Sequence, residues 1–158
     1  MLPNEYKHKM PHDDDSLILL VDDNISNLKV LGAVLSSRGY RVALASNGEE
    51  CLEFVEKQLP DLIFLDIMMP GLNGFDVCKR LKSNPKAKSI PVIFISALAN
   101  SQHITKAFES GGIDYLVKPF DKNDLLARTK VHLGIKKEMD TLRTTVIDLE
   151  EKIKQMQD

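Results

Sequence analysis

Five polar side chains of this chain stand directly after short apolar runs, which is where open α/β sheets bind their ligands. They are Asp22, Asp23, Asp66, Ser96 and Lys118. Carboxylates that gather in one place raise one another's pKa unless a cation lies among them. Oxygen ligands favour a hard divalent ion such as Mg²⁺. Because a divalent ion, a hydroxyl and an ammonium together suit a phosphoryl group, the set predicts phosphoryl transfer.

Asp66 is the best candidate nucleophile of this set. It follows the apolar run 62–65, and the Pro and Gly residues of 69–74 force a loop that a partner could approach. Attack by its carboxylate would give an aspartyl phosphate. A lone aspartate at a strand end is more often only a helix N-cap, and Asp23 or Asn24 could act in that way. Four strands that each end on a functional side chain are harder to explain by capping.

The other members of the set receive roles within this hypothesis. Ser96 would donate to one phosphoryl oxygen, and Lys118 would pair with another. Asp22 and Asp23 would hold the metal directly or through water.

Apolar runs alternate along the chain with segments of helical periodicity. The expected strands cover residues 17–21, 40–45, 62–65, 91–96 and 115–117. Helical spacing is expected in the segments 24–39, 46–59, 75–83 and 104–111. Ser46 and Glu49 fit a capping box at the start of the second helix, whose apolar face would run to Leu59. Five strand–helix alternations predict an α/β fold with a doubly wound parallel sheet, whose strand ends share one edge.

Residues 17–133 resemble the receiver domain of two-component response regulators. The likeness is carried by Asp22-Asp23, Asp66 with Met69-Pro70 and Gly74, Ser96-Ala97, and Lys118-Pro119-Phe120. The resemblance implies a flavodoxin-like five-stranded sheet of order 2-1-3-4-5 with helices on both faces. It also implies a phosphoprotein of a two-component phosphorelay, in which Asp66 accepts a phosphoryl group from a sensor histidine kinase.

Details of the site follow from the same resemblance. It implies Mg²⁺ (or Mn²⁺) bound by Asp23, Asp66 and the backbone carbonyl of Met68, with Asp22 contributing through water. It also implies a cis peptide bond before Pro119.

The resemblance further implies a switch built from Ser96 and Tyr115. When Ser96 turns toward the phosphoryl group, it leaves a space that the aromatic ring of Tyr115 can fill. The alternative for Tyr115 is an ordinary aromatic residue on an edge strand.

The expected function is that of a signalling phosphoacceptor, which is not an enzyme beyond its own phosphorylation and dephosphorylation. A phosphatase of the haloacid dehalogenase type wants a second aspartate where Met68 stands. A flavodoxin-like binder needs a Ser/Thr/Gly-rich loop after the first strand, where the chain has Asp22-Asp23-Asn24. A structural dimeriser with a silent site stays open.

Residues 134–158 form an extension with apolar residues at alternating steps of four and three. They are Ile135, Met139, Leu142, Val146, Leu149, Ile153 and Met156. This pattern predicts a coiled-coil signalling helix that continues the last receiver helix and forms a parallel homodimer through residues 135–156. Glu138 and Arg143 could pair across the dimer. Gly134 could act as a hinge or stop, and the alternative is a lone helix packed back on its own domain.

Composition bounds the remaining possibilities. The 158 residues carry a net charge of −2, which gives no bulk attraction to nucleic acid or to an anionic membrane. No apolar run is long enough to span a membrane, so we expect a cytoplasmic protein. Residues 1–16 are polar and predict a flexible N-terminal tail. Cys51 and Cys78 are expected to be reduced, half-buried thiols, and the downstream output is not identified by the sequence, which fits either a fragment or a stand-alone regulator.

Overall fold

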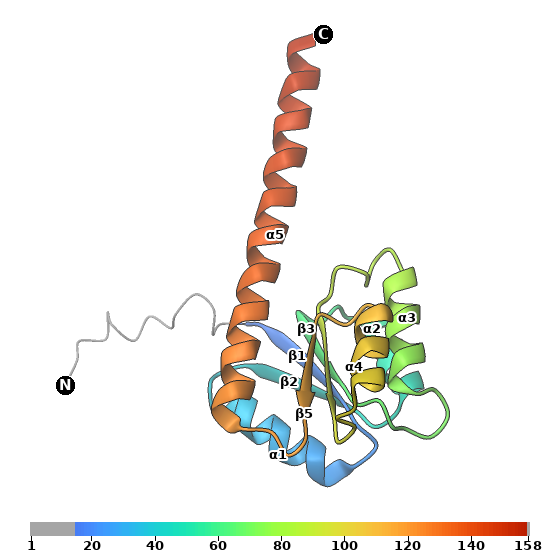
Figure 1. Ribbon diagram of the computed structural model, residues 1–158. Coiled ribbons are helices and arrows are strands. Elements are labelled where there is room, and N and C mark those ends of the chain that lie inside the picture. The colour runs from blue at the N-terminus through green and yellow to red at the C-terminus, as the bar shows by residue number, and fades with distance from the viewer. Residues whose placement is uncertain (1–14, 158) are drawn as a thin grey trace, which may run out of the picture.

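The computed structural model describes residues 15–157 and contains one five-stranded parallel sheet (Figure 1). The strands are β1 (Leu17–Val21), β2 (Arg41–Ala45), β3 (Leu62–Leu65), β4 (Val92–Ser96) and β5 (Asp114–Val117). Their order in the sheet is β2-β1-β3-β4-β5, which confirms the predicted flavodoxin-like topology. Because every neighbouring pair is parallel, all carboxyl ends lie at one edge of the sheet.

Five helices cover the sheet. They are α1 (Ile25–Ser36), α2 (Gly48–Lys57), α3 (Gly74–Ser83), α4 (Ser101–Glu109) and α5 (Lys122–Gln157). One face of the sheet packs against α1 and the first half of α5, and the other packs against α2, α3 and α4 (Figure 1). Ile18 and Leu20 of β1 point to the first face, whereas Leu19 and Val21 point to the second. Burial on both faces explains why β1, β3 and β4 read as continuous apolar runs.

Asparagine residues cap the four shorter helices. Each side-chain oxygen accepts a hydrogen bond from the backbone N–H three residues later, which satisfies an otherwise unpaired donor. The four capping residues are Asn24, Asn47, Asn73 and Asn100. In α5, Asp121 takes this role by accepting from the Asp124 N–H at 3.0 Å.

The predicted capping box of α2 is wrong by one residue. Asn47 is the cap, and the carboxylate of Glu50 accepts from the N–H and hydroxyl of Ser46. The reason is that an asparagine caps as well as a serine, which moves the reciprocal acid from Glu49 to Glu50. The helix also ends before Leu59, whose side chain is 49% exposed.

The two cysteines are more deeply placed than predicted. Both Cys51 and Cys78 are fully buried, whereas we expected half-buried thiols. Burial raises the pKa of the Cys51 thiol to about 12, which leaves it without thiolate reactivity at neutral pH.

Helix α5 is continuous over 36 residues, so Gly134 does not stop it. At about 1.5 Å per residue the helix is roughly 54 Å long. Leu133 is its last buried residue, and every residue from 138 to 157 is exposed. Figure 1 shows this second half projecting beyond the body, so the helix does not pack back on its own domain.

Two further predictions concern membrane-spanning segments and the N-terminal tail. Within residues 15–157, no helix is long and apolar enough to cross a bilayer. The predicted tail, residues 1–16, lies outside the described residues except for its last two.

Candidate functional site at the carboxyl edge of the sheet

Four strands deliver functional side chains to one rim. Asp22 follows β1, Asp66 follows β3, Ser96 ends β4 and Lys118 follows β5. The Lys118 N–H donates to the Ser96 carbonyl at 2.9 Å, which aligns the ends of β4 and β5. The amine of Lys118 reaches Asp22, 96 positions away in the sequence. The structure therefore brings together the residues that the sequence predicted to converge.

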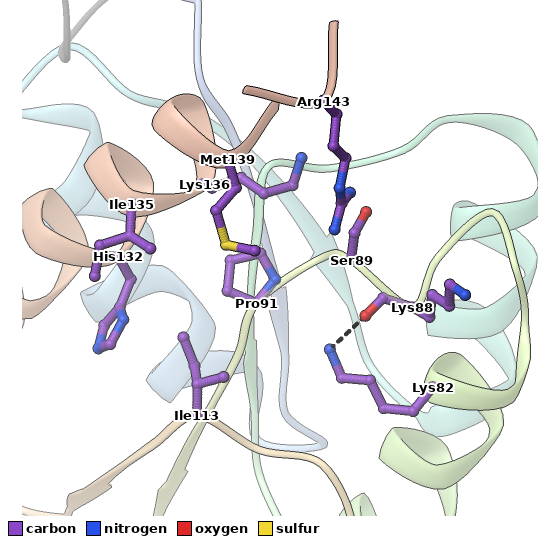
Figure 2. Close-up of a pocket in the computed structure, with 10 residues that line it drawn as sticks. All are labelled: Lys82, Lys88, Ser89, Pro91, Ile113, His132, Ile135, Lys136, Met139 and Arg143. Carbon is purple, nitrogen blue, oxygen red and sulfur yellow. Dashed lines mark hydrogen bonds between the residues drawn. The ribbon is translucent and has the colours of Figure 1, made fainter. Parts of the chain in front are cut away.

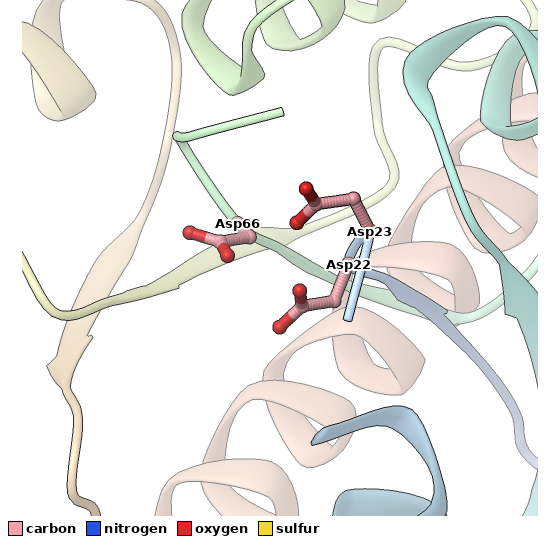
Figure 3. Close-up of side chains that lie close together, drawn as sticks. All are labelled: Asp22, Asp23 and Asp66. Atoms are coloured by element: carbon pink, nitrogen blue, oxygen red, sulfur yellow. The ribbon is translucent and has the colours of Figure 1, made fainter. Parts of the chain in front are cut away.

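Three aspartates form a compact acidic cluster at this rim. Figure 3 shows Asp22 and Asp23 from the end of β1 beside Asp66 from the end of β3. One oxygen of each lies within 4.8 Å of the others, with Asp22 and Asp66 buried and Asp23 exposed. Carboxylates this close repel one another unless a cation balances them. Because all three donors are oxygens, the cluster fits a hard divalent ion such as Mg²⁺.

Three neighbouring residues hold Asp22 in place. Its carboxylate accepts from the amine of Lys118 at 2.6 Å and from the Asn24 N–H at 2.9 Å. The amide of Asn27, in the first turn of α1, donates to it at 3.3 Å. The sequence analysis did not find Asn27, since a polar residue in the first turn of a helix carries no signal of its partner.

The carboxylate of Asp66 is fixed by its own loop and by the lysine. Oδ1 accepts from the backbone N–H of Ile67 at 2.7 Å and, more weakly, from that of Met68 at 3.4 Å. Oδ2 accepts from the amine of Lys118 at 3.2 Å. Burial raises the pKa of Asp66, the charge of Lys118 opposes this, and the charge of Asp22 adds to it. A second positive charge near Asp66 would therefore favour its ionised, nucleophilic form.

Lys118 is the positive partner of the cluster. Its amine contacts both buried aspartates, at 2.6 Å for Asp22 and 3.2 Å for Asp66. Burial by itself lowers the pKa of Lys118, but the hydrogen bond to Asp22 and the two carboxylate charges outweigh burial and raise it. The peptide bond between Lys118 and Pro119 is cis, as the resemblance implied.

Ser96 and Tyr115 lie on neighbouring strands next to this cluster. Ser96 is 1% exposed, and its hydroxyl oxygen accepts from the Leu98 N–H at 3.3 Å. The hydroxyl of Tyr115 donates to the Leu98 carbonyl, and its ring stacks on Phe94 at a centroid distance of 6.4 Å. Burial raises the pKa of Tyr115, while a hydrogen bond to Ser96 opposes the shift. Tyr115 is thus 8% exposed and tied to the segment that follows Ser96, although β5 is an edge strand.

Gly74 lets the loop after Asp66 close tightly. A Cβ atom at this position would lie 2.3 Å from the Asp66 carbonyl oxygen and 2.8 Å from the Ile67 Cα. The Gly74 N–H donates to the Ile67 carbonyl at 2.9 Å. The sequence analysis placed this glycine in a loop and among the residues that carry the family resemblance, and the structure supplies its steric reason.

A second charged cluster lies at the opposite end of β5. Asp114, the first residue of β5, accepts from Arg128 at 2.6 Å and from His132 at 2.9 Å, both on α5. Arg128 also pairs with Asp124 at 2.7 Å. Burial would raise the pKa of Asp114, but the hydrogen bonds from His132, the Tyr115 N–H and Arg128 together lower it. These contacts fasten α5 to the sheet just before the helix projects, and the sequence analysis missed them.

Comparison with known proteins gives matches over the part of the chain that contains this site. Residues 18–130 match the family model of the response regulator receiver domain. Over 76% of its length, the chain also superposes on 97% of a two-component response regulator from Clostridium difficile, with a TM-score of 0.72 and 31% sequence identity.

Curated relatives are longer than the matched region. Response regulator PleD of Caulobacter vibrioides is 41% identical over 126 residues, which are 80% of this chain and 28% of PleD. The DNA-binding response regulator MtrA of Mycobacterium tuberculosis is 36% identical over 116 residues, which are 73% of this chain and 50% of MtrA. The match therefore spans about a quarter of PleD and half of MtrA.

Proposed function

The chain belongs to the response regulator receiver family, and from this we propose that Asp66 accepts a phosphoryl group from the phosphohistidine of a sensor histidine kinase. The observation that carries the proposal is the meeting of three groups at one rim. A buried carboxylate, a lysine amine 3.2 Å from it, and two further aspartates lie together at the ends of β1, β3 and β5. This is the charge pattern that an incoming phosphoryl group needs.

The proposed step exchanges one bond to phosphorus for another. An oxygen of Asp66 attacks in line, the new P–O bond forms, and the P–N bond of the phosphohistidine breaks. The imidazole nitrogen keeps the electron pair and leaves. The Ser96 hydroxyl donates to one phosphoryl oxygen, and the Lys118 ammonium pairs with another. The protein acts in this way on itself alone, as a signalling phosphoacceptor.

Asp23, Asp66 and the backbone carbonyl of Met68 would hold Mg²⁺, or Mn²⁺, with Asp22 contributing through water. A bound ion of this kind neutralises negative charge on phosphoryl oxygens. Two observations support this division of roles. Asp23 is exposed and can reach an ion from solvent, whereas the Asp22 carboxylate is already bonded to Lys118 at 2.6 Å.

Ser96 and Tyr115 would report the phosphorylated state. When the Ser96 hydroxyl turns toward the phosphoryl group, its bond with the Leu98 N–H is lost. The Tyr115 hydroxyl donates to the Leu98 carbonyl, so a shift of Leu98 would move Tyr115 as well. Such a movement would bias the surface made by α4, β5 and α5.

We assign residues 17–133 to the receiver and residues 134–158 to a coiled-coil helix that joins two copies through residues 135–156. The apolar seam supports this, because its residues are about half exposed or more within residues 15–157. A narrow seam of this kind is typical of a coiled coil. The dimeric helix would pass the state of Asp66 to an output, whether in a longer chain or in a separate protein.

Phosphorylation of the full chain by a small phosphodonor tests the proposal. We would incubate wild type and Asp66→Asn with Mg²⁺ and acetyl phosphate and read the intact mass. Wild type should gain one phosphoryl group, and Asp66→Asn should gain none. Asp76→Asn is the matched control, since Asp76 is an exposed acid in the first turn of α3.

Two results would contradict this function. Phosphoryl uptake that persists in Asp66→Asn would refute the nucleophile. A wild type that takes up nothing with any phosphodonor or divalent ion, yet remains dimeric, would favour a structural dimeriser with a silent site.

A further inference from the structure

A hollow of about 240 Å³ lies where α5 leaves the receiver body. It is bounded on one side by α5 and on the other by Ile113, just before β5, and by the loop that joins α3 to β4. Figure 2 shows the Met139 side chain extending from α5 toward Pro91 of this loop. A cavity of roughly 150 Å³ can hold a benzene ring, so the hollow has room for aliphatic side chains.

The basic side chains around the hollow direct their charged ends elsewhere. Four of them already pair with an oxygen of the same chain, and these are Lys82, His132, Lys136 and Arg143. Figure 2 shows the ammonium of the fifth, Lys88, pointing away from the hollow. Because such side chains can bury their methylene stems while their charges lie outside, the hollow offers mainly apolar contacts. Pro91, Ile113, Ile135 and Met139 supply the rest of these contacts.

Four lining residues of α5 frame a hole of the kind that coiled coils use. In the seam, Met139 takes an a position and Ile135 a d position. A knob of one helix inserts into a hole made by four residues of the facing helix, and neighbours on a helix surface are three and four residues apart. The hole for a d residue is therefore framed by consecutive a, d, e and a positions, which here are His132, Ile135, Lys136 and Met139. All four line the hollow.

Val131 is an exposed apolar residue of α5 that lies just before the seam. It is 56% exposed and takes the g position that precedes the e position of Lys136. In a parallel coiled coil, the e and g positions of the two helices face each other. Val131 of each copy would then lie against the stem of Lys136 of the other copy, at the edge of the hollow.

We propose that the partner subunit's Ile135 inserts into this hollow and packs against Pro91 and Ile113 of the receiver body, with the partner subunit's Val131 beside it. The occupant is a second copy, because the hole has the spacing of the chain's own heptads and is continuous with the seam. The inference rests on the proposed dimer and goes beyond it, since it makes the receiver body a wall of the first coiled-coil layer. By two-fold symmetry the dimer holds two such contacts.

Substitution of Val131 in the full chain tests the contact from the side of the helix. By sedimentation equilibrium, Val131→Lys should raise the dimer dissociation constant about tenfold, because it places a second positive charge against Lys136 twice per dimer. Lysine forms helices at least as well as valine, so α5 itself should persist. Val30→Lys is the matched control, because Val30 of α1 is 58% exposed and does not line the hollow. The control should leave the dimer unchanged.

Substitution of Ile113 tests the contact from the side of the receiver body. Ile113 lies outside α5, so a dimer held by the two helices alone would not depend on it. Ile113→Ala should raise the dimer dissociation constant about tenfold, because apolar contact is lost twice per dimer. Ile25→Ala is the matched control, since Ile25 is 62% exposed and does not line the hollow.

Cross-linking gives a second, geometric readout. A mixture of Ile113→Cys chains and Val131→Cys chains, treated with a short bis-maleimide, should give covalent heterodimers that intact mass identifies. The native thiols Cys51 and Cys78 should not react, since both are fully buried.

The outcomes separate this inference from the proposed dimer. A wild type that stays monomeric at all concentrations would overturn the dimer and the contact in the hollow together. A stable dimer that is indifferent to Val131→Lys or to Ile113→Ala, or that forms no cross-link between Ile113→Cys and Val131→Cys chains, would overturn the contact in the hollow and leave the seam intact.

Discussion

The carboxyl rim of the sheet and the projecting half of α5 differ in which side chains they bury and which they expose. At the rim, charged groups are buried and matched, as Asp22 and Asp66 share the amine of Lys118. Along the projecting half, apolar groups are exposed, and Val146 and Leu149 are each more than half accessible. Buried charges must be paired within the fold, whereas an exposed apolar seam gains stability only from a partner.

This contrast indicates that the rim and the seam have different roles. The rim gathers its charged groups within one copy, and in the proposed function a small ion and a phosphoryl group bind there. In the proposed dimer, a second helix would cover the seam. The Asp114 cluster lies between these regions and fastens the helix to β5 before it leaves the body.

The largest effect is expected from a substitution that disrupts the seam and leaves the rim unchanged. Val146→Glu places a charge in the apolar seam of both helices, so the dimer dissociation constant should rise at least about 100-fold. Phosphoryl uptake from acetyl phosphate should be unchanged. Thr144→Glu, on the polar side of the same turn, is the control and should keep the dimer. A dimer that survives Val146→Glu would place the interface elsewhere.

A smaller effect is expected when the acidic cluster loses its exposed member. Asp23→Asn should raise the Mg²⁺ concentration needed to stabilise the protein about tenfold, because one charged ligand is lost. Without Mg²⁺ the variant should be at least as stable as wild type, since repulsion among the carboxylates falls. Thermal unfolding at increasing Mg²⁺ measures both, with Asp76→Asn as control. An unchanged Mg²⁺ dependence would contradict the assigned ligand.

The Asp114 cluster offers a test that depends on pH. Asp114→Asn should lower the free energy of unfolding by roughly 1–2 kcal/mol at neutral pH, because Arg128 and His132 lose a charged acceptor. The folded protein lowers the pKa of Asp114 below its ordinary 3.8, so its contribution is complete above pH 3.8 and is lost as pH falls through the lower, folded value. Urea unfolding of both proteins should therefore show a difference that narrows only in acid. A stability difference that grows in acid would contradict the assigned lowering of the Asp114 pKa.

The smallest effect concerns Gly134 and has the opposite direction. A Cβ atom there would meet nothing within 4 Å, so Gly134→Ala should raise the free energy of unfolding by up to about 1 kcal/mol. Gly74→Ala is the contrasting control and should destabilise, because its Cβ would strike the Asp66 carbonyl. A loss of stability in Gly134→Ala would mean that the helix bends at this residue in solution.

The sequence predicted the sheet and the rim well for a physical reason. Strands buried on both faces leave continuous apolar runs, and the residue that ends each run is the one delivered to the rim. Asp66 and Lys118 could therefore be placed without coordinates. The cap of α2 was predicted one residue too early, because Ser46 and Asn47 are both residues that can cap a first turn.

Pairings of polar residues away from the carboxyl edge of the sheet could not be predicted. Nothing in the sequence links Asp114 to Arg128, because the contact depends on how α5 crosses the start of β5. The hollow lined by Lys88, Ile135 and Arg143 could not be predicted either, since it exists only where the loop between α3 and β4 meets the projecting helix. Both lie outside any local pattern of periodicity.

We propose that carboxylates at the ends of β1 and β3 hold a divalent ion with which Asp66 takes up a phosphoryl group. Mapping of the phosphoryl group by peptide mass spectrometry, with Mg²⁺ and again with a chelator, tests it most directly. We predict modification of Asp66 in the presence of Mg²⁺ and none with the chelator. A phosphoryl group on any other residue, or on Asp66 regardless of the chelator, would contradict the account.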